Sequence, residues 1–278
     1  MATIDDLLRE GRRRLEAASP TPVLDAQLLL GHVLGKPRSF LLAWPEHEPE
    51  IAQVRRFLEL LERRCHGEPV AYLTGRREFW AYEFEVEPAV LIPRPETELL
   101  VERALARIPA TAAWRLADTG TGSGALAVTL KLERPRCTVL ATDRSFAALR
   151  LAQRNARRLG ARIACIQADW LAPIASASLD LIVSNPPYIP AGDPHLQEEI
   201  RFEPRQALVA GSDGLDAYRR LIPQARRVLR PGGWLLLEHG FNQHEAVAAL
   251  LKQAGFRNIG GQADLQGHLR VTEAQRSP

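Results

Sequence analysis

The chain has 278 residues, of which 46% are hydrophobic and 25% are charged. This composition supports a large hydrophobic core and a smaller second one, and it excludes a disordered chain. The 36 basic and 33 acidic side chains leave a formal net charge of only +3, which is small for a protein that neutralises many phosphates. The three cysteines, Cys65, Cys137 and Cys165, show no CxxC spacing, which excludes a disulfide framework and argues against a zinc site.

The first residues, MATIDDLLREGRRR, place acidic side chains before a short apolar stretch. No apolar run approaches the roughly 18 residues of a membrane-spanning helix. We therefore expect a cytoplasmic, monomeric protein with no membrane partner.

Residues 1–75 have the periodicity of helices and predict a small helical bundle. Thr21 and Pro22 are typical of a helix start, and Gly35 is typical of the end of that helix. Two further helices are indicated by apolar residues that share one helical face: Ile4, Leu7, Leu8 and Leu15 in the first, and Ile51, Val54, Leu58, Leu61 and Cys65 in the second.

Residues 76–95 predict a β-hairpin that joins two domains. Tyr82, Phe84 and Val86 alternate with glutamates, which is typical of a half-buried strand, and we expect residues 90–92 to pair with it.

Residues 96–278 alternate strands with helices, which predicts an α/β domain with a mostly parallel sheet covered on both faces. The last two strands, near Arg257–Gly260 and Leu269–Thr272, are expected to form an antiparallel hairpin. The five preceding strands are expected at Trp114–Ala117, Thr138–Ala141, Ile163–Ala168, Leu179–Ser184 and Trp234–Glu238.

A glycine-rich loop, DTGTGSG over residues 118–124, follows the first of these strands and begins a helix. Closely spaced glycines let a backbone approach a ligand. Asp143 ends the next strand, where a carboxylate can accept hydrogen bonds from a ribose diol. This pair predicts a nucleoside-containing cofactor. Because Ala125 stands where the dinucleotide fingerprint needs a third glycine, S-adenosylmethionine fits better, with Asp169 and Trp170 beside the adenine.

The tetrapeptide Asn185-Pro186-Pro187-Tyr188 follows a buried strand that is expected to lie beside the first. It would therefore emerge next to the glycine loop. The Asn185 carboxamide oxygen and the Pro186 carbonyl can accept both hydrogens of a planar amino group, and Tyr188 can stack on it. We predict that this corner directs the amino nitrogen toward an electrophilic methyl group, without a nucleophilic residue or a metal.

The chain also resembles a known family, the release factor glutamine methyltransferases (HemK/PrmC). The resemblance covers nearly the whole chain and is most specific in IPRPETE, residues 92–98, together with NPPY. It implies a class I S-adenosylmethionine-dependent methyltransferase, Rossmann-like with a seven-stranded sheet, and an N-terminal helical domain that recognises the substrate. Members methylate the side-chain amide nitrogen (N5) of the glutamine in the GGQ motif of class I peptide chain release factors, leaving S-adenosyl-L-homocysteine.

The resemblance assigns roles to particular residues of this sequence. Asp143 would hold the ribose and Trp170 would lie by the adenine. Arg94 and Glu96 would lie near the pocket mouth, with Glu203 and Pro204 on the substrate side. The residues lining the cofactor would be Gly120, Thr121, Gly122, Ser123, Gly124 and Asn185, and those holding the glutamine would be Asn185, Pro186, Pro187 and Tyr188.

Two other functions fit part of the pattern. An adenine-N6 or cytosine-N4 methyltransferase acts on an amino group of the same local geometry, but it needs phosphate contacts to extrude its base, and the chain has no basic arm. We therefore expect no direct nucleic-acid partner. A nucleoside-binding regulatory module would bind the cofactor without turnover. We expect His239, which follows the last parallel strand, to have a packing or hydrogen-bonding role.

Overall fold

The structure is a computed structural model that describes residues 2–197 and 199–277. Its contacts divide the chain into two compact units, where the sequence suggested two domains and a linker. The helical unit comprises Met1–Arg76 together with Pro194–Phe202, and the sheet unit comprises Arg77–Asp193 together with Glu203–Pro278. The sequence pattern gave no sign that Pro194–Phe202 belongs with the helical unit.

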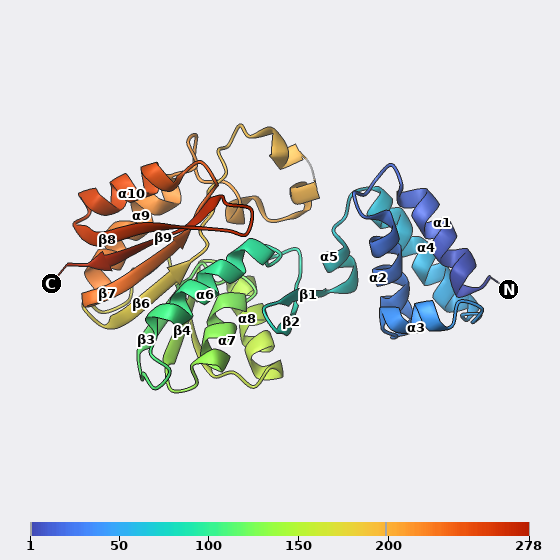
Figure 1. Cartoon of the computed structure of the whole chain (residues 1–278), viewed down its shortest axis with the longest axis horizontal. Helices are drawn as coiled ribbons and strands as arrows, with labels where there is room; N and C mark the ends of the chain where they lie inside the picture. The colour runs from blue at the N-terminus through green and yellow to red at the C-terminus, as the bar shows by residue number, and fades with distance from the viewer. Residues whose placement is uncertain (1, 198, 278) are drawn as a thin grey trace. The chain divides into compact units, whose positions relative to one another are not determined.

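The helical unit begins with four helices and a short fifth one (Figure 1). The second begins after Thr21 with Pro22 in its first turn and ends at Gly35, whose φ of +63° favours glycine, as predicted. The helices are α1 (Ile4–Leu15), α2 (Pro22–Leu34), α3 (Arg38–Ala43), α4 (Ile51–Cys65) and α5 (Val70–Thr74).

The buried face of α4 differs from the predicted one. Ile51 is 69% exposed, whereas Phe57 and Leu60 are fully buried. The reason is a buried ion pair, because Arg64 Nε lies 2.7 Å from Asp25 Oδ2 on α2 and so turns a charged position of α4 inward. A pattern built on apolar residues alone cannot detect such a pair.

A two-stranded hairpin of β1 (Arg76–Phe79) and β2 (Tyr82–Glu85) precedes the main sheet. The predicted pairing of β2 with residues 90–92 is wrong, since β2 pairs with β1 instead. The backbone N–H of Ile92 donates to Glu203 Oε2 over 2.9 Å, and Pro93 has no N–H to give to a ladder.

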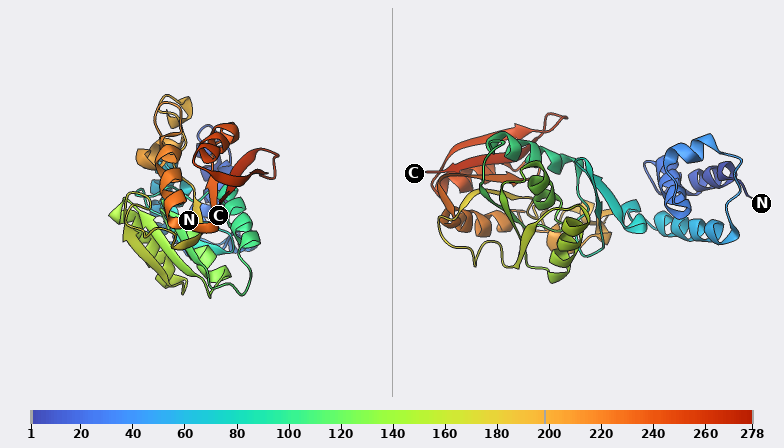
Figure 2. Two further views of the ribbon diagram at one scale, coloured as in Figure 1. Left: turned by 90° about the vertical axis from the view of Figure 1, so that its left-hand side faces the viewer. Right: turned by 90° about the horizontal axis from the view of Figure 1, so that it is seen from below.

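The main sheet has seven strands in the order β5-β4-β3-β6-β7-β9-β8. The first five strands in sequence pair in parallel, with β3 between β4 and β6. The antiparallel pair at the C-terminus is confirmed, and its second strand inserts between β7 and β8 (red in Figure 2). The strands are β3 (Arg115–Thr119), β4 (Thr138–Asp143), β5 (Ile163–Gln167), β6 (Leu179–Ser184), β7 (Leu229–Glu238), β8 (Phe256–Ala263) and β9 (Leu269–Arg276).

Helices cover both faces of this sheet (Figure 1). Alternate residues of β6 show the two layers, because Leu181 packs in one hydrophobic cluster and Ile182 in the other. The first cluster contains residues of α6 (Glu98–Arg107), α7 (Ala125–Glu133) and α8 (Phe146–Arg158), and the second contains residues of α9 (Asp216–Val228) and α10 (His244–Gln253). No helix in residues 2–197 and 199–277 is long and apolar enough to cross a bilayer.

The fully buried side chain of Asn155 on α8 ties the hairpin to the loop that follows β3. Its Nδ2 donates to the carbonyls of Glu85 and Ser123, each over 2.9 Å, and its Oδ1 accepts from the Glu85 N–H over 2.8 Å. One amide therefore satisfies three backbone groups of two separate segments.

We predict that Asn155→Ala lowers the free energy of unfolding by about 2–4 kcal/mol, because three backbone groups lose their partner. Urea unfolding measures the change. The exposed amide Gln153 on the same helix gives a matched control, and Gln153→Ala should change stability by less than about 0.5 kcal/mol. Equal unfolding midpoints for the two variants would contradict the role given to Asn155.

Candidate functional site

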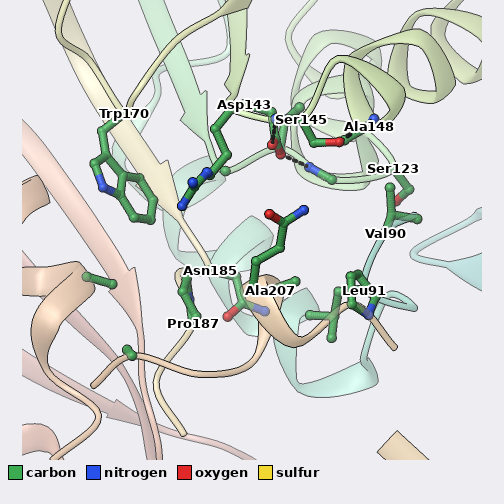
Figure 3. Close-up of a pocket in the computed structure, with 18 of the residues that line it drawn as sticks. Val90, Leu91, Ser123, Asp143, Ser145, Ala148, Trp170, Asn185, Pro187 and Ala207 are labelled. Carbon is green, nitrogen blue, oxygen red and sulfur yellow. Dashed lines mark hydrogen bonds between the residues drawn. The ribbon is translucent and has the colours of Figure 1, made fainter. Parts of the chain in front are cut away.

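A cavity of about 340 Å³ lies at the carboxyl ends of the parallel strands of the sheet unit. This is the position of ligands in doubly wound sheets, where the strand order reverses between β3 and β6. Figure 3 shows Asp143, Trp170, Ser123, Val90 and Asn185 around this space. The volume is within the range of small-molecule sites.

The glycine loop forms one wall, as predicted, and Gly120, Thr121, Gly122 and Ser123 line the cavity. Gly124 does not line it, but it has a separate steric reason to be glycine. Its φ is +84°, and a Cβ there would lie 2.9 Å from the Cβ of Ala152 on α8. The absence of a side chain therefore lets the loop pack directly against α8.

Asp143 lies at the end of β4 and is hydrogen-bonded to the glycine loop, beside which it was predicted to bind the cofactor. Its Oδ2 accepts from the Gly122 N–H over 3.0 Å, and its Oδ1 accepts from the Ser145 N–H over 2.8 Å. Burial raises the pKa of this carboxyl above its ordinary value, while the backbone donors act in the opposite direction. Each oxygen keeps further acceptor capacity, which a ligand diol can use.

Trp170 lines the cavity beside the loop, and its Cζ3 lies 3.4 Å from the position of a Cβ on Gly120. Its φ is +56°, a left-handed conformation that is uncommon for a bulky residue. Asp169 also lines the cavity, where it forms an ion pair with Arg220. The predicted aromatic side chain and carboxylate are therefore both present at this wall.

Asn185 emerges from β6 and lines the cavity. Its Nδ2 donates to Thr97 Oγ1 over 3.0 Å. Its Oδ1 is buried and has no hydrogen-bond partner in the part of the chain that the structure describes. Buried polar atoms almost always have a partner, so this oxygen is available to accept a hydrogen bond from a ligand.

Thr97 was not predicted, although it belongs to the IPRPETE motif. It ends the short 3₁₀ helix Pro95–Thr97 and lines the cavity, where its hydroxyl accepts from Asn185 Nδ2. Its hydroxyl also favours the ionised form of the Glu238 carboxyl at the end of β7, but burial of that carboxyl has the larger effect. Burial raises the pKa of Glu238 to about 7. The sequence signal for Thr97 is the one hydroxyl of the IPRPETE motif, which lies between two glutamates.

The other predicted residues are divided between the cavity wall and its surroundings. Pro187 and Arg94 line the cavity, whereas Pro186, Tyr188 and the exposed Glu96 do not line it. Tyr188 is half-buried, and burial raises the pKa of its phenol.

Glu203 is placed on the substrate side by the resemblance, but it forms an ion pair with Arg94 and accepts from the Ile92 N–H. Its carboxylate therefore stabilises the cavity wall. Pro204, its neighbour in sequence, lines the cavity.

Asp118 is a second residue that sequence reasoning missed. The carboxylate is fully buried, and its Oδ2 accepts from the Thr121 hydroxyl over 2.5 Å and from the Ala127 N–H over 3.1 Å. It therefore links the glycine loop to the first turn of α7. Burial raises the pKa of Asp118 to about 7.

His239 has the hydrogen-bonding role that the sequence predicted. Its Nδ1 lies 2.9 Å from the Gly240 carbonyl, and its Nε2 lies 2.9 Å from Thr272 Oγ1. Burial lowers the pKa of the imidazole to about 4, so the ring is neutral at pH 7. Within residues 2–197 and 199–277, no group of three or more His, Cys, Asp or Glu residues has the geometry to hold a metal ion.

The strand order and the cavity at the reversal point are those of class I S-adenosylmethionine-dependent methyltransferases. Two solved structures share this fold. A 16S rRNA N2 G1207 methyltransferase of T. thermophilus superposes with a TM-score of 0.56 at 20% identity, over 72% of this chain and 49% of that one. A ribosomal protein L11 methylase of Lactobacillus delbrueckii gives 0.52 at 22% identity, over 73% and 90%.

Sequence comparison identifies the family. Residues 6–75 match the PrmC N-terminal domain, and residues 95–213 match the methyltransferase small domain. Release factor glutamine methyltransferases are 48% identical in Pseudomonas aeruginosa, over 99% of each chain, and 47% identical in Salmonella typhimurium, over 94% of each. The counterpart in Bordetella pertussis is 49% identical over 90% of this chain and 94% of its own. The chain belongs to the release factor glutamine methyltransferase family.

The raised pKa of Asp118 predicts a pH-dependent stability. The unfolded chain ionises this group near 3.8 and the folded chain near 7, so the folded state holds an extra proton between these values. The free energy of unfolding therefore falls as the pH rises through that range. Asp118→Asn removes this contribution, and its stability relative to the unsubstituted protein should rise by roughly 2–4 kcal/mol between pH 5 and pH 8.

Urea unfolding of both proteins at the two pH values measures this difference. Glu238 is present in both, so its own titration cancels in the comparison. A stability difference that does not change with pH would show that Asp118 is ionised throughout.

Proposed function

We propose that this protein transfers a methyl group from S-adenosylmethionine to the side-chain amide nitrogen (N5) of the glutamine in the GGQ motif of class I peptide chain release factors. The observation that carries the proposal is the buried Asn185 Oδ1, which has no hydrogen-bond partner among residues 2–197 and 199–277. Asn185 lines the same cavity as the glycine loop and Asp143. The family named above supports the choice of substrate.

The cavity wall formed by the glycine loop, Asp143 and Trp170 suits the cofactor. Gly120, Gly122 and their neighbours offer a close backbone approach, Asp143 has acceptor capacity for a ribose diol, and Trp170 offers an aromatic face. When bound, S-adenosylmethionine supplies a methyl group on a positively charged sulfur and leaves as S-adenosyl-L-homocysteine. The side chains that line the cavity hold it in place and exclude water.

Asn185 is the residue that we assign to the acceptor nitrogen. Its Oδ1 accepts an N–H of the glutamine amide, which orients the nitrogen and increases its electron density. Pro186 and Tyr188 remain assigned to the same group, through a backbone carbonyl and an aromatic ring. The methyl transfer needs no nucleophilic side chain. The rate enhancement comes from positioning the two reactants and excluding water from the cavity.

A nucleic-acid amino group is the competing acceptor, because its local geometry is the same. Against it stands the charge balance, a formal net charge of +3 with acidic and basic side chains interspersed. Base extrusion requires several phosphate contacts, which this composition does not favour.

The proposal is tested by incubating a purified release factor with the protein and S-adenosylmethionine, followed by mass spectrometry of the peptide that contains the GGQ motif. We expect the glutamine to gain the mass of one methyl group in place of hydrogen. A factor in which that glutamine is replaced by asparagine is the control and should stay unmodified. Methylation of DNA or RNA instead of the factor would contradict the proposal.

Two substitutions should distinguish the residue that contacts the acceptor from the residue that contacts the cofactor. Asn185→Ala should lower kcat by roughly 100- to 1000-fold while leaving the cofactor Kd unchanged, because it removes an acceptor-side contact. Asp143→Ala should raise the cofactor Kd by about 10- to 100-fold, because it removes the predicted ribose contact. Calorimetry and a methyl-transfer assay measure the two effects, and each variant is the control for the other. An Asn185→Ala variant with full turnover would exclude its role.

A further inference from the structure

We propose that Gln243 positions Tyr188, the last residue of the NPPY tetrapeptide, by holding its backbone carbonyl. Gln243 is a positioning residue in this account, and Tyr188 is the residue that it acts through. The inference deepens the proposed function and rests on it for the role of the Tyr188 ring at the substrate amide.

Gln243 joins the NPPY tetrapeptide to the loop that follows β7. It is the residue directly before α10, and it is only 9% exposed. Its Nε2 donates to the Tyr188 carbonyl over 2.9 Å, and its Oε1 accepts from the Gly240 N–H over 3.0 Å. Both ends of one buried carboxamide are therefore bonded to backbone groups, which lie 55 and 3 residues away in sequence.

The orientation of the Gln243 carboxamide follows from the polarity of these backbone groups. A backbone carbonyl can only accept a hydrogen bond, and a backbone N–H can only donate one. The Tyr188 carbonyl must therefore meet the amino end of the side chain, and the Gly240 N–H must meet its oxygen. The reversed carboxamide would place a donor against a donor and an acceptor against an acceptor, so it would lose both bonds.

A glycine leaves room for the bond between Gln243 and Tyr188. Gly214 has a φ of +76°, and a Cβ there would lie 2.3 Å from the Tyr188 carbonyl oxygen and 2.7 Å from Gln243 Nε2. Any other residue at this position would displace one of the two partners. The bond therefore also accounts for a glycine in the loop that precedes α9.

Two further hydrogen bonds beside Tyr188 come from backbone groups. The Ile189 N–H donates to the Leu208 carbonyl over 2.9 Å, and the Ile189 carbonyl accepts from the Ala210 N–H over 3.0 Å. A side-chain substitution does not remove these two bonds, whereas the bond to the Tyr188 carbonyl depends on a side chain. Gln243 is therefore a position at which a substitution can loosen the end of the tetrapeptide.

The loop that carries Gln243 is anchored to the end of β7. The Gly240 carbonyl accepts from the Gln243 N–H over 2.9 Å, and it lies 2.9 Å from Nδ1 of His239. His239 is fully buried. The backbone of Tyr188 is therefore held against a loop that is itself fixed to the sheet.

Holding the carbonyl also holds the Tyr188 ring. The carbonyl carbon and Cβ are bonded to the same Cα, so a shift of this peptide unit carries the ring with it. Pro186 and Pro187 have restricted φ angles, so the tetrapeptide has little freedom to compensate. Because a misplacement of about 1 Å can lower a rate about 100-fold, Gln243 affects the reaction without touching the substrate.

The test compares Gln243→Glu with Gln243→Ala at pH 8, well above the ordinary glutamate pKa of about 4.3. The ionised glutamate keeps an oxygen for the Gly240 N–H but has no proton for the Tyr188 carbonyl, and the alanine loses both bonds. We expect both variants to lower kcat for release-factor methylation about 10- to 100-fold with an unchanged cofactor Kd. Full turnover in either variant would overturn the proposal.

Gln253→Glu is the matched control, because Gln253 is exposed at the end of the same helix and the substitution adds the same charge. It should leave kcat unchanged. A Gln253→Glu variant as impaired as Gln243→Glu would show that the added charge, rather than the lost hydrogen bond, lowers the rate, and it would contradict the role of Gln243.

Gln243→Glu on a Tyr188→Ala background separates positioning from a general structural role. If Gln243 acts through the Tyr188 ring, the substitution should lower the residual kcat of Tyr188→Ala by less than about 2-fold. An undiminished loss on that background would mean that Gln243 does not act through Tyr188.

A measurement that does not depend on activity keeps this proposal separate from the proposed function. Tyr188 and Ile189 form the one Tyr-Ile pair in the sequence. Labelling the tyrosine carbonyls with ¹³C and the isoleucines with ¹⁵N therefore gives a single correlated carbonyl resonance in the NMR spectrum, that of Tyr188. A hydrogen bond deshields a carbonyl carbon, so we expect this resonance to move upfield in Gln243→Glu and Gln243→Ala and to stay in place in Gln253→Glu.

The NMR result distinguishes the two ways in which the account can fail. An unmoved Tyr188 resonance in both Gln243 variants would overturn the positioning role. A resonance that moves as expected, in a protein that does not methylate a release factor, would overturn the proposed function alone.

Discussion

The site depends on the parallel pairing of β3 with β6 in the centre of the sheet. Asp118 lies opposite Val183 in that register, and the Ser184 hydroxyl donates to the Thr119 carbonyl over 2.6 Å. The glycine loop directly follows β3 and Asn185 directly follows β6, so both lie at the carboxyl ends of these parallel strands. Because the register of two buried strands is fixed by their hydrophobic faces, a ligand held by the loop is brought beside the Asn185 carboxamide.

The glycine loop itself is held by the side chain of its first residue and by two side chains from outside it. Asp118 binds its start, Asp143 accepts from Gly122, and Asn155 donates to Ser123. Each contact provides a hydrogen-bond partner for a polar group that loses contact with water on folding. The loop is therefore held in position before any ligand binds. A preorganised site spends less of its binding energy on ordering the protein.

Much of this site can be predicted from the sequence, because several of its residues directly follow strands that have recognisable sequence patterns. The glycine loop, Asp143 and Asn185 each follow a strand, and the strand order then brings them together. Thr97 and Asn155 could not be predicted in this way, since their roles come from contacts with residues 88 and 70 positions away. The pairing of β2 and the buried face of α4 were also mispredicted. In these regions the Ile92 N–H and the Arg64 side chain contact carboxylates that are distant in sequence, those of Glu203 and Asp25.

A crystal structure of the protein with S-adenosyl-L-homocysteine and a peptide that contains Gly-Gly-Gln tests the role of Asn185 most directly. We expect the glutamine amide nitrogen to lie about 2.7–3.2 Å from Asn185 Oδ1, with Nδ2 still directed at Thr97. A glutamine bound away from Asn185, or an Asn185 oxygen satisfied by the protein itself in that complex, would contradict it.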